Sequence, residues 1–240
     1  MPEPLLTRYL QPLLAGRRAE CFSLIQSAIE SGGDPETLMR DVVWPATVQV
    51  RRLFDDDRIN AAIENMACRI NRTIADQLQA RLPQTPPSGK RIIVVSADPQ
   101  HEELGAQMLA DLFQSRGWEV YFLGGALPDD EIVELVGRVA PNALLIFGSE
   151  APAVPLIRAL IHRIRDIGIC PTMNIVVSGG VFGRADGLWR EVGADLHIEE
   201  PFDAVERIDQ LEPRTCTAVR TGFVKQRRRR RKAAVASAAT

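Results

Sequence analysis

One histidine, His101, has the residue type and the position to do chemistry. It lies in the polar turn ADPQHEE, between an apolar run at residues 92–95 and a helical pattern that begins near Leu104. Open α/β sheets bind ligands at the carboxyl ends of their strands, which is where this turn would lie. An imidazole there can bind a metal ion or carry a proton. The neighbouring Gln100, Glu102 and Glu103 could accept its second ring N–H, as partners of metal-bound histidines do.

The region from residue 91 to about 210 alternates between strands and helices. Apolar runs predict strands near 91–96, 119–123, 143–147, 174–178 and 195–198. Ser149 follows the third of these strands, and the pair Gly179-Gly180 follows the fourth. Such alternation is typical of a parallel sheet with helices on both faces.

The first 82 residues carry helical patterns instead. The clearest runs through Ile59, Ile63, Met66, Ile70, Ile74 and Leu78, at spacings of three and four residues. Asp34-Pro35-Glu36 favours a helix start, and Pro45 should kink or interrupt the helix that follows. Four amphipathic helices in this length predict a small bundle.

Composition changes mark the limits of the predicted parts. The proline-rich stretch LPQTPPSGK, residues 82–90, interrupts the helical and strand patterns. We therefore expect a helical bundle at 1–82, a linker at 83–90, a sheet domain at 91–212 and a disordered basic tail at 213–240.

The charge of the chain is unevenly distributed. The formal net charge is −2, but Lys225 with Arg227 to Lys232 contributes seven positive charges, which leaves −9 for the rest. Consecutive arginines without interleaved aromatic residues would contact DNA phosphates without reading sequence. The tail could equally be solubilising disorder or an arm that docks on an acidic partner.

Several features exclude other classes of protein. The four cysteines show no zinc spacing and are typical of reduced thiols in a cytoplasmic protein. The chain shows no signal-peptide pattern and no apolar run of the roughly 18 residues that span a bilayer. It has no GxSxG motif, P-loop or histidine-rich metal cluster, so we expect no enzyme activity of its own. His162 and His197 are interpreted as non-ligands, and Trp44 as a packing residue.

The segment 92–125, IIVVSADPQHEELGAQMLADLFQSRGWEVYFLGG, resembles the cobalamin-binding domain family. The motif of that family reads Asp-x-His-x-x-Gly, and here one extra residue stands on each side of His101, between Asp98 and Gly105. The resemblance implies an α/β fold, with a helical bundle followed by a Rossmann-like (flavodoxin-like) parallel-sheet domain that binds cobalamin. It implies that His101 is the cobalt ligand, and that Ser149 and the pair Gly179-Gly180 line the site of the nucleotide tail.

The bundle carries a second resemblance. RRLFDDDRINAAIENMACRI, residues 51–70, is similar to the capping segment of light-sensing cobalamin regulators, with Phe54 at the tryptophan position. The family's Glu-His pair is Glu64-Asn65 here. This similarity implies that Phe54, Glu64, Asn65 and Met66 cap the upper face of the corrin ring.

The overall layout resembles the AerR/PpaA antirepressor group of photosynthetic bacteria. That resemblance implies a cobalamin-binding, light- or redox-responsive transcriptional regulator that acts by contacting a repressor of the CrtJ/PpsR type. Two alternatives stay open: a corrinoid carrier protein for a methyltransferase, and a haem-binding redox sensor of the same fold.

Overall fold

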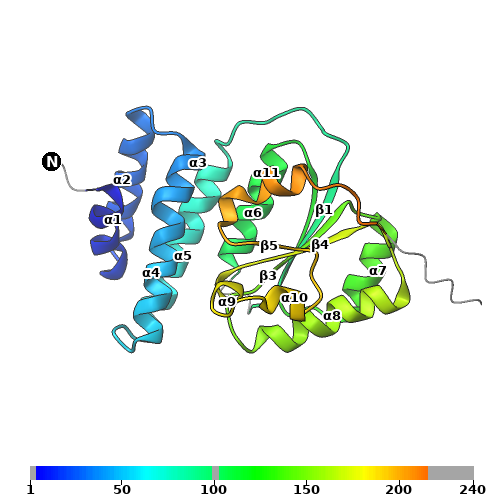
Figure 1. The fold of residues 1–240 in the computed structure, drawn as a ribbon. Coiled ribbons are helices and arrows are strands. Elements are labelled where there is room, and N and C mark those ends of the chain that lie inside the picture. The colour runs from blue at the N-terminus through cyan, green and yellow to red at the C-terminus, as the bar shows by residue number, and fades with distance from the viewer. Residues whose placement is uncertain (1–3, 99–102, 216–240) are drawn as a thin grey trace, which may run out of the picture.

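A computed structural model shows the fold in Figure 1 and describes residues 4–98 and 103–215. The predicted site residues Gln100, His101 and Glu102 lie outside the described residues, as do Lys225 and Arg227 to Lys232. Within the described ranges, no helix combines the length and the apolar character that crossing a membrane requires.

The amino-terminal part is the predicted helical bundle. Its α-helices are α1 Leu5–Leu14, α2 Arg18–Glu30, α3 Pro35–Leu38, α4 Trp44–Asp55 and α5 Ala61–Gln79. The side chains of Asp34 and Asn60 accept hydrogen bonds from Thr37 N (2.7 Å) and Ile63 N (3.0 Å), so they cap α3 and α5. A buried polar chain crosses the core, because Tyr9 Oη donates to Asn71 Oδ1 at 2.7 Å and Asn71 Nδ2 donates to Thr47 Oγ1 at 3.0 Å.

The interruption expected at Pro45 is a π-helical turn. Residues Met39–Val43 form this turn between α3 and α4, and Pro45 then lies in the first turn of α4. Proline has no N–H to donate to the preceding turn, and the wider π-helical turn directly before it compensates for this missing bond. The path from α3 to α4 is therefore continuous.

The second part is a five-stranded sheet in which every neighbouring pair is parallel. Its strands are β1 Arg91–Ser96, β2 Glu119–Gly124, β3 Ala143–Phe147, β4 Asn174–Ser178 and β5 Leu196–Ile198, in the order β2-β1-β3-β4-β5. This is the flavodoxin-like order, which places a ligand crevice at the carboxyl ends of β1 and β3. The predicted fold class is confirmed.

Helices cover both faces of the sheet (Figure 1). One face packs against α6 Leu104–Ser115 and α11 Ala204–Asp209. The other packs against α7 Asp129–Val139, α8 Ala153–Ile167, α9 Gly180–Gly183 and α10 Leu188–Glu191. A 3-10 turn, Pro201–Asp203, leads into α11.

Helix α6 joins the two parts of the molecule. Its side chains Leu104, Met108 and Leu112 belong to the core of the bundle, whereas Leu109 and Phe113 pack against the sheet. The segment predicted as a linker is fastened to the end of α6, since Thr85 N donates to Ser115 O at 2.9 Å. The domain limits stay predictions.

Asp111 on α6 should make stability depend on pH. Its Oδ2 atom is buried and accepts no hydrogen bond from the described residues; burial and, secondly, the carboxylate of Asp76 raise its pKa from 3.8 to about 7. The folded state therefore holds a proton that the unfolded chain has lost, and stability falls as the pH rises from about 4 to about 7. Asp111→Asn should leave stability at pH 4 nearly unchanged and raise it at pH 8.

Urea unfolding at the two pH values tests this expectation. We expect Asp111→Asn to raise the free energy of unfolding at pH 8 by about 1 kcal/mol. This is less than the full pKa shift of Asp111 implies, because the side chain is partly exposed and solvent screens its charge. Asp166→Asn, at an exposed position of α8, is the control and should change little at either pH. If the Asp111→Asn protein is no more stable than wild type at pH 8, the ionised carboxylate of Asp111 does not destabilise the folded state.

Candidate functional site

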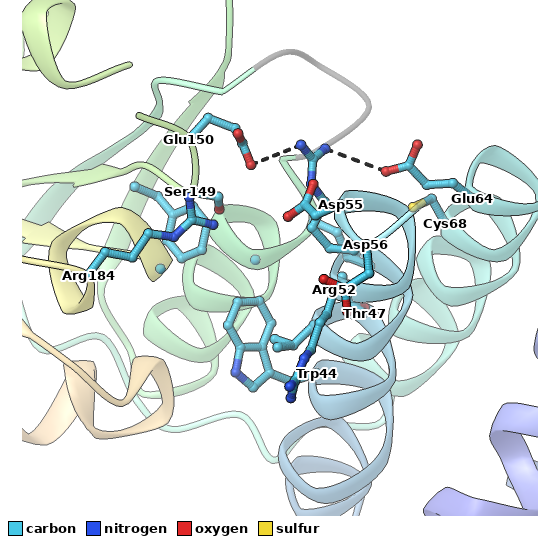
Figure 2. A pocket seen from close by; sticks show the side chains of 16 residues that line it. Trp44, Thr47, Arg52, Asp55, Asp56, Glu64, Cys68, Ser149, Glu150 and Arg184 are labelled. Carbon is cyan, nitrogen blue, oxygen red and sulfur yellow. Dashed lines mark hydrogen bonds and ion pairs between the residues drawn. The ribbon is translucent and has the colours of Figure 1, made fainter. Parts of the chain in front are cut away.

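A cavity of about 330 Å³ lies between the helical bundle and the carboxyl edge of the sheet (Figure 2). Its apolar wall consists of Trp44, Val48, Leu104 and Phe147. The remaining lining residues are polar, charged or glycine: Thr47, Arg51, Arg52, Asp55, Asp56, Glu64, Cys68, Gly105, Ser149, Glu150, Gly180 and Arg184. The site therefore combines an apolar wall with a charged rim.

The bundle supplies its share of the cavity wall from one face of each of two helices. On α4, the lining residues run from Trp44 to Asp55 at steps of three and four residues, which is the spacing of a single helix face. On α5, Glu64 and Cys68 are one turn apart. Trp44 thus lines the cavity, beyond the packing role expected for it.

Gly105 is enclosed by two aromatic rings. Trp44 and Phe147 meet edge to face, with ring centroids 6.1 Å apart and planes at 75°. A Cβ atom on Gly105 would lie 2.5 Å from Phe147 Cζ and 2.7 Å from Trp44 Cζ3. Because α6 begins at Leu104, only glycine allows its first turn to approach the rings this closely.

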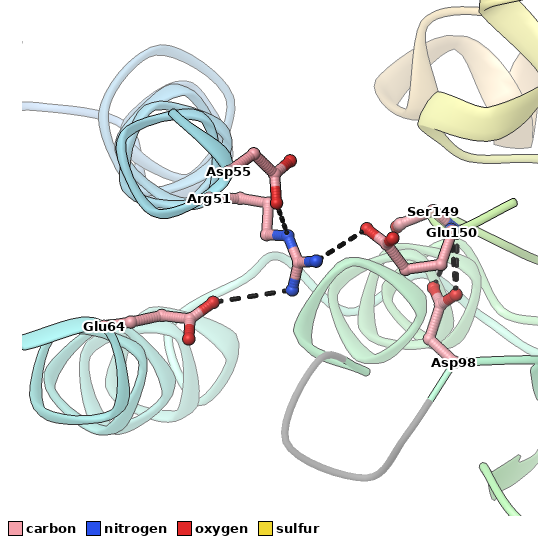
Figure 3. A network of polar contacts seen from close by, with 6 residues as sticks. All are labelled: Arg51, Asp55, Glu64, Asp98, Ser149 and Glu150. Atoms are coloured by element: carbon pink, nitrogen blue, oxygen red, sulfur yellow. Dashed lines mark hydrogen bonds and ion pairs between the residues drawn. The ribbon is translucent and has the colours of Figure 1, made fainter. Parts of the chain in front are cut away.

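The carboxylate of Asp98 ties the end of β1 to the loop after β3 (Figure 3). Asp98 is 1% exposed, and its two oxygens accept hydrogen bonds from Ser149 N at 2.9 and 2.8 Å. Glu150 N donates to Oδ1 of the same carboxylate at 3.3 Å. These bonds fix the crevice between β1 and β3, where the strand order places a ligand.

A second carboxylate, that of Glu103, anchors the chain directly after residues 99–102, as Asp98 does directly before them. Arg72 of α5 donates to Glu103 Oε1 at 3.1 Å, and Gly125 N donates to Oε2 at 3.3 Å. The residues on both sides of the segment that contains His101 are therefore anchored, one to β3 and one to the bundle and β2.

Arg51 connects the bundle to the sheet across the cavity (Figure 3). Its guanidinium pairs with Asp55 at 2.9 Å, with Glu150 at 3.0 Å and with Glu64 at 3.5 Å. Its cation also lies over the Phe54 ring, 5.5 Å from the ring centroid. Glu64 is only 7% exposed, and Arg51 supplies a positive charge beside this buried carboxylate.

The glycine pair after β4 has two separate roles. Gly179 has φ +104°, and a Cβ there would lie 2.2 Å from Gly148 O, so the tight packing of two loops requires glycine. Gly180 lines the cavity, and a Cβ there would meet nothing within 4 Å. It leaves bare backbone facing the cavity.

The structure brings together part of the predicted site. Gly105, Ser149, Gly180 and Glu64 line one cavity, and Gly179 shapes the loop beside it. The other three predicted residues within the described ranges, Phe54, Asn65 and Met66, do not line this cavity. Phe54 lies beneath Arg51, Asn65 Nδ2 donates to Ala61 O at 2.9 Å, and the Met66 side chain lies against Gly16.

Helix geometry explains the places of Asn65 and Met66. With Glu64 facing the cavity, the next two residues are rotated by about 100° and 200° around the helix and point elsewhere. Cys68, one turn after Glu64, is a lining residue that the sequence reasoning missed. Arg51 and Glu150 were also missed, since no local pattern marks an ion pair between residues so far apart in the chain.

Family comparison decides the class of the site. Residues 90–208 match the family described as B12 binding domain, and residues 5–79 match a second family with the same description. This chain belongs to the B12-binding proteins. The two matches meet at the cavity, and cobalamin, the predicted cofactor, is supported over the haem alternative.

Corrinoid proteins are among the relatives of this chain. Dimethylamine corrinoid protein 1 of Methanosarcina acetivorans is 20% identical over 181 residues, which is 74% of this chain and 84% of that protein. Dimethylamine corrinoid protein 2 of Methanosarcina mazei is 22% identical over 181 residues, 74% and 83% of the two chains. The structure of the Methanosarcina barkeri monomethylamine corrinoid protein matches with a TM-score of 0.75 at 15% identity, covering 86% of this chain and 98% of that one.

These relatives correct the predicted function. The light-responsive antirepressor was wrong, and so was its partner, a repressor of the CrtJ/PpsR type, because the relatives are corrinoid proteins. The alternative of a corrinoid carrier is the better supported reading. The error has a physical origin: a bundle over a sheet edge is a general way to enclose a corrin, and it does not specify what the corrin is used for.

The described residues fit a corrin ring. Trp44 and Phe147 offer an apolar wall for a flat macrocycle, and the bare backbone of Gly180 leaves room beside it. Cobalamin carries amide groups around its ring, and the charged and hydroxyl side chains of the rim can form hydrogen bonds with them.

Proposed function

We propose that this protein is a corrinoid carrier that holds cobalamin for a partner methyltransferase. The observation that carries the proposal is the cavity at the junction of the two B12-binding matches, in a chain whose relatives are corrinoid proteins. When bound, cobalamin supplies a cobalt ion that can carry a methyl group and give it up to a nucleophile. The reaction itself would belong to the partner enzyme.

The residues of the chain would hold and shield the cofactor. The aromatic wall of Trp44 and Phe147 would exclude water from one side of the ring. Arg51 would keep the bundle against the sheet edge through its pairs with Glu64 and Glu150. Asp98 would keep the loop after β3 in place beside the cofactor.

His101 is the proposed cobalt ligand, with Gln100 and Glu102 as candidates to accept its second N–H. His101→Ala should therefore shift the visible spectrum of the cobalamin-loaded protein and weaken retention of the cofactor on a desalting column. His162→Ala, at an exposed position of α8, should change neither. An unchanged spectrum and unchanged retention in the His101→Ala protein would remove this residue as the ligand.

The carrier role can be tested with a partner. The protein is loaded with [14C-methyl]cobalamin and incubated with the methyltransferase encoded nearest to its gene and a thiol acceptor. We expect the label to leave the protein fraction only when both enzyme and acceptor are present. Release at the same rate without the enzyme would contradict the proposal.

A further inference from the structure

The buried polar chain of the bundle ends at the wall of the cofactor cavity. Tyr9 of α1 donates to Asn71 of α5, and Asn71 donates to Thr47 of α4. Tyr9 and Asn71 are both 0% exposed, whereas Thr47 lines the cavity. Among the described residues, α1 contributes none to the cavity lining, so this chain connects a helix away from the cavity to its wall.

The hydrogen bonds of the chain all run in one direction. Thr47 Oγ1, which accepts from Asn71, donates in turn to Val43 O at 2.9 Å. Val43 is the last residue of the π-helical turn. Burial raises the pKa of Tyr9, so the phenol keeps its proton and stays a donor. Hydrogen bonds aligned in this way polarise and strengthen one another in a low-dielectric interior.

The cavity end of the chain fixes an aromatic wall. Trp44 and Thr47 are three residues apart on α4, and both line the cavity (Figure 2). Trp44 begins the helix directly after the π-helical turn, and its ring meets Phe147 edge to face. Because Thr47 is bonded both to the turn and to α5, it holds the start of α4 against the core of the bundle. The position of Trp44 therefore depends on the bonds of Thr47.

We infer that Tyr9 and Asn71 are positioning residues, which act through Thr47 and keep the bundle wall preformed for the corrin ring. This inference deepens the proposed carrier function and rests on its cofactor. Without the Tyr9 hydroxyl, the amide oxygen of Asn71 loses its donor at a buried position. Asn71 then turns or draws in water, and its bond to Thr47 weakens. The cofactor itself has to order the wall on binding, which lowers affinity.

The test compares isosteric variants of the full-length protein by absorbance titration with hydroxocobalamin. Tyr9→Phe and Thr47→Val each remove one hydroxyl from the chain, and each should raise the Kd about fivefold. The double variant should also raise it about fivefold, because both substitutions break the same chain. Thr47→Ser keeps the hydroxyl and should stay within about twofold of wild type. The visible circular dichroism of the bound corrin should change in the variants that lose affinity.

Ser115→Ala is the matched control. Ser115 is 1% exposed, and its hydroxyl donates to Leu112 O at 2.8 Å, outside the buried polar chain. Its loss should lower stability without changing the Kd or the circular dichroism of the bound cofactor. Hydrogen exchange on the cofactor-free protein gives a separate readout, because the backbone amides of residues 46–50 should exchange faster in Tyr9→Phe than in Ser115→Ala.

Three results would overturn the inference. A wild-type Kd and circular dichroism in the Tyr9→Phe protein would mean that the chain only stabilises the fold. Losses that multiply to about 25-fold in the double variant would mean that Tyr9 and Thr47 act independently. If Tyr9→Phe does not fold, the two single Thr47 variants decide, and equal Kd values for them would remove the hydrogen bonds of Thr47 as the cause. Failure of the carrier role would appear separately, as absent methyl transfer with the differences in exchange and affinity intact.

Discussion

Replacing Asp98 with alanine should lower the free energy of unfolding by about 3 kcal/mol and remove most cobalamin binding. The carboxylate is 1% exposed and accepts hydrogen bonds from the backbone N–H groups of Ser149 and Glu150. Alanine would leave both donors without this partner at the edge of the cavity. Urea unfolding gives the stability change, and equilibrium dialysis with hydroxocobalamin gives the binding change.

Two further variants make this result specific. Asp98→Asn keeps one acceptor oxygen, so it should cost less than Asp98→Ala in both measurements. Asp130→Ala removes an exposed ion pair with Arg163 and should cost less than about 1 kcal/mol, without an effect on binding. An Asp98→Ala protein as stable as the Asp130→Ala protein would refute the anchoring role.

Gly105→Ala should reduce cobalamin affinity by more than tenfold and destabilise the protein by about 2 kcal/mol. The added methyl group would lie 2.5 Å from one aromatic ring and 2.7 Å from another, and neither ring can move aside without disturbing the cavity wall. The measurements are the same as for Asp98.

A second substitution separates this clash from a general loss of helix geometry. Phe147→Leu removes the ring whose Cζ atom is the nearest contact, so the Gly105→Ala/Phe147→Leu protein should recover part of the lost stability. If the two substitutions were simply additive, the clash with Phe147 would not be the cause.

The sheet domain could be predicted closely because its signals are local. Apolar runs marked β1, β3 and β4 with their observed limits, and the alternation with helices implied the parallel sheet. The crevice could be placed as well, because the carboxyl ends of the strands follow directly from the order of the elements.

The wall that the bundle contributes could not be predicted in the same way. The apolar period of α5 includes Met66, which is 37% exposed, whereas the buried face at that end of the helix carries Glu64. Burial of Glu64 is compatible with folding because Arg51 lies beside it, and Arg51 is also paired with Glu150, 99 residues further along the chain. Such long-range pairs leave no trace in hydrophobic periodicity.

The most direct test of the carrier function is a methyl-loading measurement on the reconstituted protein. The protein is saturated with hydroxocobalamin and desalted, reduced with titanium(III) citrate, treated with [14C]iodomethane and desalted again. We expect about one cobalamin and one labelled methyl group to stay with each chain, as carriage by a single site requires. A protein that retains cobalamin but takes up no label, or that loses the cofactor on the first column, would contradict a carrier.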